Sequence, residues 1–136
     1  MRKIFLALIS SALLSGTALA EEVKIGIILG FTGPIESLPP DMGAGAELAI
    51  AEVNGGGALL GGASVTGVRA DSTCIDSAAA QAAAERLITS DKVNAIMGAD
   101  CSGVTGAILA NVAVPNGVVM ISPSATSPGL STAEDD

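Results

Sequence analysis

Residues 23–34 read Val-Lys-Ile-Gly-Ile-Ile-Leu-Gly-Phe-Thr-Gly-Pro, and this stretch decides the fold class. From Val23 to Leu29 the run is nearly all apolar, as expected of a β-strand covered on both faces of a parallel sheet. The later pair Pro39-Pro40 cannot continue either regular structure, so residues 30–40 are predicted to form a loop at the carboxyl end of this strand.

The rest of the chain alternates short strands with helical stretches, the order βαβαβαβ. This order predicts an α/β fold, a Rossmann-like parallel sheet with helices on both faces. A four-stranded sheet with no final helix leaves one side poorly covered, so we expect the fold to be incomplete and the chain truncated. The later strands are predicted at 63–70, 93–97 and 118–121, and the helices at 41–53, 76–90 and 103–114, with Asp76 as a helix N-cap.

The first twenty residues have the three regions of a secretory signal peptide. Arg2 and Lys3 give the positive start, residues 4–14 are an apolar run too short to span a bilayer, and Ala18-Leu19-Ala20 is a small-residue cleavage motif. We predict cleavage after Ala20 and an exported, soluble product with no membrane insertion afterwards, since no later apolar run reaches the roughly 20 residues that a span needs. The alternative is an N-terminal anchor or a core helix.

The chain is acidic and nearly free of aromatic side chains. Its 136 residues carry 14 Asp and Glu against 6 Lys and Arg, for a formal charge of −8. A chain this negative repels nucleic-acid phosphates and anionic lipid surfaces, so neither is an expected partner. The absence of His excludes a His general base, a Ser-His-Asp or Cys-His pair and an imidazole metal ligand. Function then has to come from hydroxyls, carboxylates and backbone groups.

The common cofactor and nucleophile motifs are missing. The run Gly43-Ala44-Gly45 begins like a dinucleotide fingerprint, but it lacks the final glycine and falls inside a predicted helix. No Gly-Lys-Ser/Thr triplet is present, and Asp100 stands where a Gly-x-Ser-x-Gly elbow around Ser102 would need glycine. We predict no cofactor, no metal and no enzymatic activity. Acidic side chains interpreted as solvated faces or caps without chemistry are Glu36, Glu47, Glu52, Asp71 and Asp91.

Cys74 and Cys101 are an even pair in a chain predicted to be exported, so we interpret them as one disulfide. Two thiols without His leave a zinc site incomplete, and their spacing is far from Cys-x-x-Cys, which argues against metal and redox roles. The bond would tie the loop before the 76–90 helix to the loop that holds Ser102. It would fix the position of a ligand site there or simply stabilise the domain.

Two hydroxyl-bearing loops follow the third and fourth predicted strands. Ser102 stands where a helix begins, so its side chain and the nearby backbone N–H groups can face one anion; plain N-capping by Ser102 is the alternative. Ser124 and Thr126 lie in the next loop, for which a Pro-rich turn is the alternative. Adjacent parallel strands bring such loops within reach of one small ligand, so we predict a binding site there.

Several motifs together resemble the leucine-isoleucine-valine binding protein family, which are periplasmic solute-binding proteins of ABC transporters with two α/β lobes. The resemblance covers essentially the whole chain after residue 20. It implies a type I periplasmic-binding fold, of which residues 21–136 would be an incomplete first, N-terminal ligand-binding lobe. The segments that carry it are Val23–Ile27, Thr32–Pro34, Gly45–Ala49, Cys101-Ser102 and Ile121–Pro128.

The resemblance implies which residues hold the α-carboxylate and α-ammonium groups of an amino-acid ligand. They are Ser102, Ser124 through its carbonyl, Thr126 through hydroxyl and amide, the neighbouring Ala125, and Leu38 in the first loop. It also places the two family cysteines at Cys74 and Cys101. Family members often have an aromatic residue where Leu38 stands, and any aromatic wall for the ligand would come from a second lobe.

The function implied is import of a branched-chain amino acid, or a related small carboxylate or amide, from the periplasm. The partners implied are a small amino-acid-like ligand and the membrane subunits of an ABC permease, and binding would proceed by domain closure. Two alternatives are an exported Rossmann-like enzyme with its catalytic part in further sequence, and a ligand-sensing receptor domain of the same fold.

Overall fold

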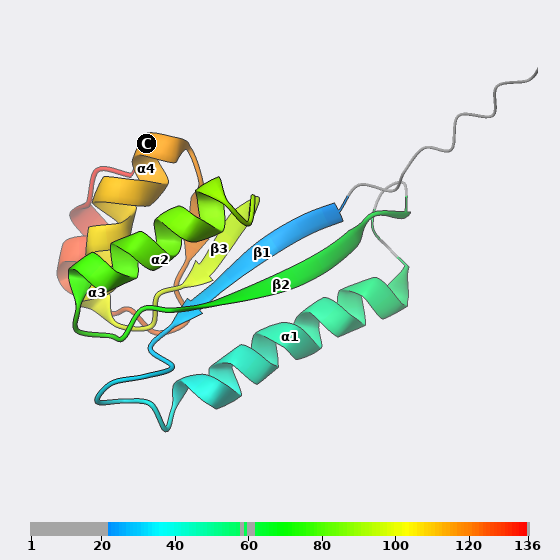
Figure 1. Cartoon of the computed structure of the whole chain (residues 1–136), viewed down its shortest axis with the longest axis horizontal. Coiled ribbons are helices and arrows are strands. Elements are labelled where there is room, and N and C mark those ends of the chain that lie inside the picture. The colour runs from blue at the N-terminus through cyan, green and yellow to red at the C-terminus, as the bar shows by residue number, and fades with distance from the viewer. Residues whose placement is uncertain (1–21, 58, 60–61, 136) are drawn as a thin grey trace, which may run out of the picture.

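The computed structural model describes residues 22–57, 59 and 62–135, and in this part of the chain four strands form one parallel sheet. The strands are β1 (Glu22–Leu29), β2 (Ser64–Asp71), β3 (Ala95–Gly98) and β4 (Val119–Ile121), in the order β2-β1-β3-β4. β1 is hydrogen-bonded on both sides, with Ile27 opposite Arg69 of β2 and Met97 of β3 (Figure 1). The predicted parallel α/β sheet is therefore confirmed, whereas the predicted signal peptide at residues 1–20 lies outside the described residues.

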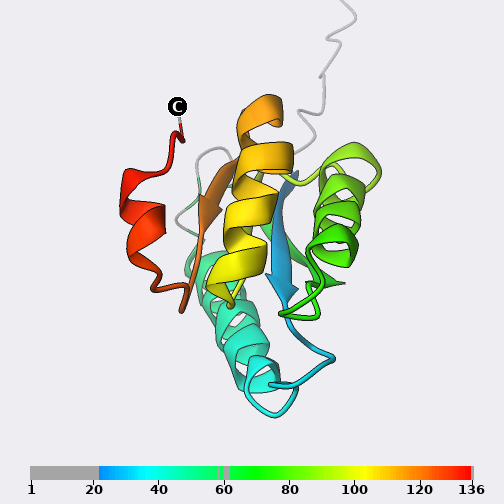
Figure 2. The same ribbon diagram turned by 90° about the vertical axis from the view of Figure 1, so that its left-hand side faces the viewer.

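Helices cover both faces of the sheet, as the apolar sequence of β1 predicts. α1 (Pro39–Gly56) packs over β2 and β1 on one face. The other face carries α2 (Ser77–Thr89) and a continuous helical run made of α3 (Ser102–Ile108), the π-helical turn η2 (Leu109–Ala113) and α4 (Val114–Asn116) (Figure 2). Ile27, Ile28 and Leu29 are completely buried between the two layers. Burial of this kind, at about 25 cal/mol per Å² of apolar surface, is the main force that holds the layers together.

The largest difference between the predicted and observed helices is at α1. The Pro39-Pro40 pair, assigned to the loop before the first helix, forms the first residues of α1. Proline is tolerated there because its missing N–H would have no intrahelical partner and its fixed φ suits the helix. α1 also runs three residues further than expected, to Gly56, and ends on Gly57 in the left-handed conformation. Asp76 is confirmed as the N-cap of α2, since it accepts hydrogen bonds from the amides of Ala78 and Ala79.

β4 is an edge strand and is only partly covered. Met120 points toward the core under the α3–η2 run, while Val119 and Ile121 are 66% and 70% exposed. These two side chains alternate onto the face that carries α1, and α1 lies over β1 and β2 rather than over β4. A short 3-10 helix, η3 (Pro128–Thr132), follows the polar loop after β4 and was not predicted.

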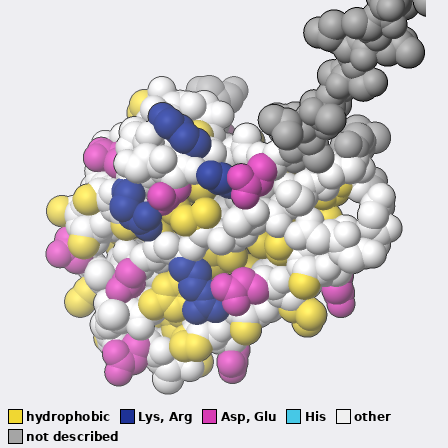
Figure 3. All heavy atoms as spheres, turned by 45° about the vertical axis from the view of Figure 1, so that its right-hand side comes forward, with side chains coloured by type: hydrophobic (Ala, Val, Ile, Leu, Met, Phe, Trp, Pro, Cys, Tyr) yellow, Lys and Arg dark blue, Asp and Glu magenta, His cyan; other side chains and the backbone are white. Residues whose placement is uncertain are grey.

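Ion pairs in the described part of the chain lie on the surface. Arg69 of β2 forms a two-point contact with Glu47 of α1, and Arg86 pairs with Asp91 at the end of α2. Figure 3 shows basic side chains beside acidic ones on one face of the molecule. Within the described residues, no helix combines the length and the apolar character that crossing a membrane requires.

We expect Gly98→Ala to destabilise the protein by at least about 3 kcal/mol, because it adds strain and a backbone clash at the end of β3. Gly98 has φ +132°, and an added Cβ would lie 2.0 Å from the carbonyl oxygen of Ile28. Urea unfolding of the purified protein measures the loss. The matched control is Gly45→Ala in exposed α1, where nothing lies within 4 Å of the new Cβ and a gain of about 1 kcal/mol is expected. Equal stability of the two variants would contradict this account.

Candidate functional site

The carboxyl ends of the four strands meet along one edge of the sheet, which we call the carboxyl edge. It consists of the loops after β1 (residues 30–38), β2 (72–76), β3 (99–101) and β4 (122–127). Parallel pairing brings these loops together although their residues are as far apart in the sequence as 30 and 127. Ligands of open α/β sheets bind at this edge, so it is the first place to look for a site.

Ser102 joins the loop after β3 to the loop after β4. Its Oγ accepts the backbone N–H groups of Thr126 at 3.0 Å and Ser127 at 3.1 Å. The N-cap of α3 is Cys101, without a side-chain cap, so the alternative that Ser102 merely caps its own helix is wrong. The Ser102 hydroxyl can also donate one hydrogen bond, and no acceptor for it is found among the described residues.

The loop after β4 is held by two further serine hydroxyls. Ser124 donates to the carbonyl oxygen of Asp100 at 2.8 Å, and Ser122 donates to the carbonyl oxygen of Ala99. The Ser122 Oγ in turn accepts the N–H of Ala125 at 2.8 Å. The residues expected from sequence to meet a ligand, Ser124 to Thr126, therefore lie directly against the segment that leads into Ser102.

Those contacts also determine which groups of this loop are free. The Thr126 amide, which the resemblance assigns to the ligand, donates to Ser102 in this structure. The Ser124 hydroxyl is used inside the protein. The exposed Thr126 hydroxyl makes no hydrogen bond to another described residue. Hydroxyls of Ser102 and Thr126 are thus two of the donors that this edge can offer to an anionic group.

Cys74 and Cys101 form a disulfide with an S–S distance of 2.05 Å, which confirms the predicted pairing. The bond joins the loop after β2 to the residue before Ser102. Gly30 lies beside it, since a Cβ on that glycine would meet Cys74 Cβ at 3.1 Å. The disulfide therefore packs under the first loop as well.

Asp100 is a site feature that sequence reasoning missed. It is only 4% exposed, and its two carboxylate oxygens accept the N–H of Gly30 at 3.0 and 3.1 Å. The nearby hydroxyl of Thr105, also buried, donates to the carbonyl oxygens of Ala99 and Cys101 and fixes this turn. A charged residue directly after the apolar third strand was the available signal, but its partner stands 70 residues earlier in the chain.

Asp71, at the end of β2, was interpreted as a solvated or capping residue without chemistry, and the structure adds that it organises the first loop. Its carboxylate accepts from the hydroxyl and the amide of Thr32, and from the amide of Thr73 at 2.8 Å. Partial burial raises the pKa of Asp71, but these hydrogen bonds outweigh it and lower the pKa below its ordinary value. On the outer surface, the hydrogen bond from Arg69 lowers the pKa of Glu47.

Leu38 ends the first loop and precedes α1 as its N-cap residue. The side chain is 56% exposed, so it lies open to solvent at the start of the helix. The structure thus places Leu38 in the carboxyl-edge loop after β1. Within the described part of the chain, the hydrogen bonds to the Ser102 side chain come from the loop after β4 and not from the loop that holds Leu38.

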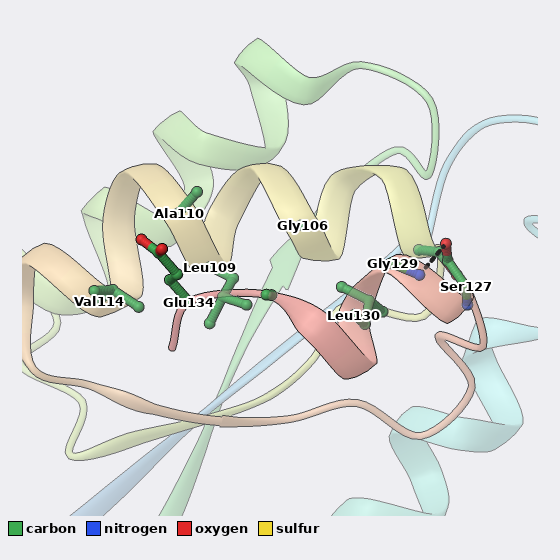
Figure 4. A pocket seen from close by; sticks show the side chains of 10 residues that line it. Gly106, Leu109, Ala110, Val114, Ser127, Gly129, Leu130 and Glu134 are labelled. Atoms are coloured by element: carbon green, nitrogen blue, oxygen red, sulfur yellow. Dashed lines mark hydrogen bonds between the residues drawn. The ribbon is translucent and has the colours of Figure 1, made fainter. Parts of the chain in front are cut away.

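A pocket of about 670 Å³ runs from Ser102 along the α3–η2–α4 run. Ser127 lies at one end, where its amide contacts Ser102. Leu130 and Leu109 line the middle, and Val114 and Glu134 lie toward the other end (Figure 4). The arrangement offers hydroxyls at the carboxyl edge and an apolar wall beside them. In the described part of the chain, no cluster of three or more potential metal-binding side chains is found.

Comparisons with known proteins identify similar chains. A family model described as "Periplasmic binding protein" matches residues 22–134. The Leu/Ile/Val-binding protein of Escherichia coli (strain K12) is 31% identical over 116 residues, and a leucine-, isoleucine-, valine-, threonine- and alanine-binding protein of Pseudomonas aeruginosa is 31% identical over 132 residues. These matches cover 85% and 97% of this chain, and 30% and 34% of the two relatives.

The fold also matches a solved structure of this kind. A branched-chain amino acid transporter substrate binding protein from Streptococcus pneumoniae, solved in complex with isoleucine, superposes with a TM-score of 0.74 at 35% sequence identity. The match covers 82% of this chain and 31% of that protein. The chain therefore spans about a third of the length of the proteins it resembles.

Reduction of the Cys74–Cys101 bond is expected to lower the melting temperature, because a cross-link closing a loop of this size contributes about 3 kcal/mol in the chain-entropy model. Calorimetric scans with and without a thiol reductant measure the shift, and the double variant Cys74→Ser/Cys101→Ser, scanned without reductant, serves as the check. An unchanged melting temperature in both would contradict the bond's stabilising role.

Acid titration is expected to reveal the contribution of Asp71. Because its folded pKa lies below the ordinary 3.8, its stabilisation is complete above that value and is lost as the pH falls through the folded pKa. Asp71→Asn is therefore expected to be less stable than the wild type at pH 7, with the difference shrinking as the pH falls below 3.8. Glu36→Gln, an exposed position in the first loop, is the control and should follow the wild-type curve. A difference between Asp71→Asn and wild type that is constant with pH would refute the assignment.

Proposed function

We infer the function of this chain from one premise: it belongs to the periplasmic binding protein family. We propose that it is substrate-binding sequence of an ABC transporter that takes up a branched-chain amino acid or a related small carboxylate or amide. The relatives named above are described as binding leucine, isoleucine and valine, and the Streptococcus pneumoniae protein was solved with isoleucine. The chain spans about a third of the length of these proteins. The substrate and the partners are therefore proposed for a whole protein of this kind that contains the sequence.

The observation that carries the proposal is the junction between Ser102 and the loop after β4. Two backbone amides converge on the Ser102 hydroxyl, which leaves that hydroxyl and the Thr126 hydroxyl as donors at the carboxyl edge. A ligand carboxylate is the group that two such donors suit, since hydrogen bonds to a charged partner are roughly twice as strong as neutral ones. The Ser124 carbonyl is proposed as the acceptor for the ligand ammonium group.

Ala125 and Leu38 complete the proposed site. Ala125 has its amide held by the Ser122 hydroxyl, which keeps the loop between Ser124 and Thr126 in one shape. The exposed Leu38 is proposed to contact the aliphatic side chain of the ligand from the first loop. Burial of an apolar group of this size would contribute on the order of 1 kcal/mol or more to binding.

We propose binding without chemical conversion. The hydroxyls at the carboxyl edge have no His partner, because the sequence contains none, and the buried Asp100 is occupied by a backbone amide. The relatives are solute-binding proteins, whose task is to capture and deliver a ligand. The proposed partners are therefore the small ligand and the membrane subunits of an ABC permease.

The proposed location is the periplasm. The support is the family membership together with the charged start, apolar run and Ala18-Leu19-Ala20 motif of the first twenty residues. Cleavage after Ala20 and a ligand-binding lobe from residue 21 onward are part of the same proposal. An oxidising compartment also agrees with the Cys74–Cys101 disulfide.

We expect Ser102→Ala and Thr126→Ala each to weaken binding of L-leucine, L-isoleucine or L-valine by about 1–3 kcal/mol, because a buried ligand charge loses a hydrogen-bond donor. Isothermal titration calorimetry on the purified protein measures the affinities. Thr89→Ala is the matched control. The exposed Thr89 hydroxyl lies at the end of α2 away from the carboxyl edge and donates to the carbonyl oxygen of Glu85 in the same helix. Wild-type affinity in both site variants would refute the assigned site.

A further inference from the structure

Among the described residues of the carboxyl edge, Asp100 alone forms hydrogen bonds to all three other loops. Its carboxylate accepts the Gly30 amide from the loop after β1 and, at 3.4 Å, the Ser72 hydroxyl from the loop after β2. Its backbone carbonyl accepts the Ser124 hydroxyl from the loop after β4. Asp100 itself stands two residues before Ser102, so these contacts converge beside the proposed ligand donors.

We propose that Asp100 is a positioning residue of the ligand site, holding the first loop in register with Ser102 and Thr126. The proposal rests on the proposed function, since it concerns the same site. Asp100 would act through Gly30 and Ser124 rather than by touching the ligand, because its side chain is buried and both of its carboxylate oxygens are already used.

Burial of this carboxylate is costly, which argues that it does more than fill space. Among the described residues the ion pairs are Lys24–Glu22, Arg69–Glu47 and Arg86–Asp91, so none of them neutralises Asp100. Its charge is compensated by neutral donors alone. Replacing both partners of a buried hydrogen bond by apolar groups can leave stability nearly unchanged, but removing one partner leaves the other with its full desolvation cost. Here the Gly30 amide would be left without a partner.

The other side-chain contacts of the first loop reach the Ser102 segment only by way of the loop after β2. Asp71 links Thr32 to Thr73, and the disulfide then links Cys74 to Cys101. The Asp100–Gly30 contact connects the first loop to the Ser102 segment in a single step. Without it, the first loop would be tied to the Ser102 segment by the β1–β3 pairing, which ends at Ile28 and Gly98, and by the two successive links through the loop after β2. Binding sites lose affinity when supporting contacts of this kind are loosened.

The test compares Asp100→Ala with Asp100→Asn in the purified protein. Asp100→Ala is expected to speed hydrogen exchange of the Gly30 amide at least about tenfold and to weaken L-leucine binding by about tenfold or more. Asp100→Asn keeps one acceptor oxygen and nearly the same volume, so intermediate values are expected for both measurements. It also provides the comparison if Asp100→Ala fails to fold.

Val112→Ala is the control for a loss of stability alone. Val112 is completely buried in η2, ten residues further along the helical run than Ser102, and its truncation leaves a cavity there. Wild-type Gly30 exchange and wild-type L-leucine affinity are expected in this variant. If Val112→Ala weakens binding as much as Asp100→Ala does, the effect follows stability and the positioning role is refuted.

The two readouts separate this proposal from the proposed function. Fast Gly30 exchange in Asp100→Ala with unchanged L-leucine affinity overturns the positioning role and leaves the proposed function in place. Unchanged Gly30 exchange also overturns it, whatever the ligand result. A wild-type protein that binds none of L-leucine, L-isoleucine and L-valine instead overturns the proposed function, and this proposal with it.

Discussion

Parallel pairing of β1 with both β2 and β3 is the constraint on which the rest of the structure depends. A parallel neighbour can be reached only through a crossover, so each of β1, β2 and β3 is followed by a helix that returns the chain to the opposite edge. The crossovers bury both faces of β1 and leave all four strand ends at one edge. Four loops of polar sequence must then share a small space and satisfy one another's backbone groups.

The polar side chains of the carboxyl edge have two separate roles: some hold the loops together, and others offer hydroxyls to a ligand. Two carboxylates and one disulfide hold the loops together. Asp71 accepts hydrogen bonds from Thr32 and Thr73, and Asp100 accepts the amide of Gly30. The disulfide joins Cys74 to Cys101. The hydroxyl of Ser102 lies next to these contacts and accepts the amides of the loop after β4. Backbone dipoles and neutral hydroxyls bind charged small molecules well when they are fixed in advance, because little ordering remains to be done on binding.

Much of the fold was predictable because its signals are local. The apolar run of β1, the Ala-rich α2 with Asp76 before it, and the glycines that end α1 each act over a few residues. The Pro39-Pro40 pair was misplaced because proline both breaks a helix interior and suits a helix start, and local sequence does not separate the two. The turn η3 was missed because it is short and follows a loop rich in serine and proline.

The sequence by itself determined the parallel α/β class, the pairing of its two cysteines and the loops in which hydroxyls would gather. These follow from periodicity, from an even cysteine count and from the rule that strand ends meet at one edge. Tertiary structure alone decided that Ser102 accepts the Thr126 and Ser127 amides, and that Asp100 is buried against Gly30. Those contacts join residues that are 24 to 70 positions apart in the sequence. Which loops become neighbours depends on the order of the strands in the sheet, and a short stretch of sequence does not determine that order.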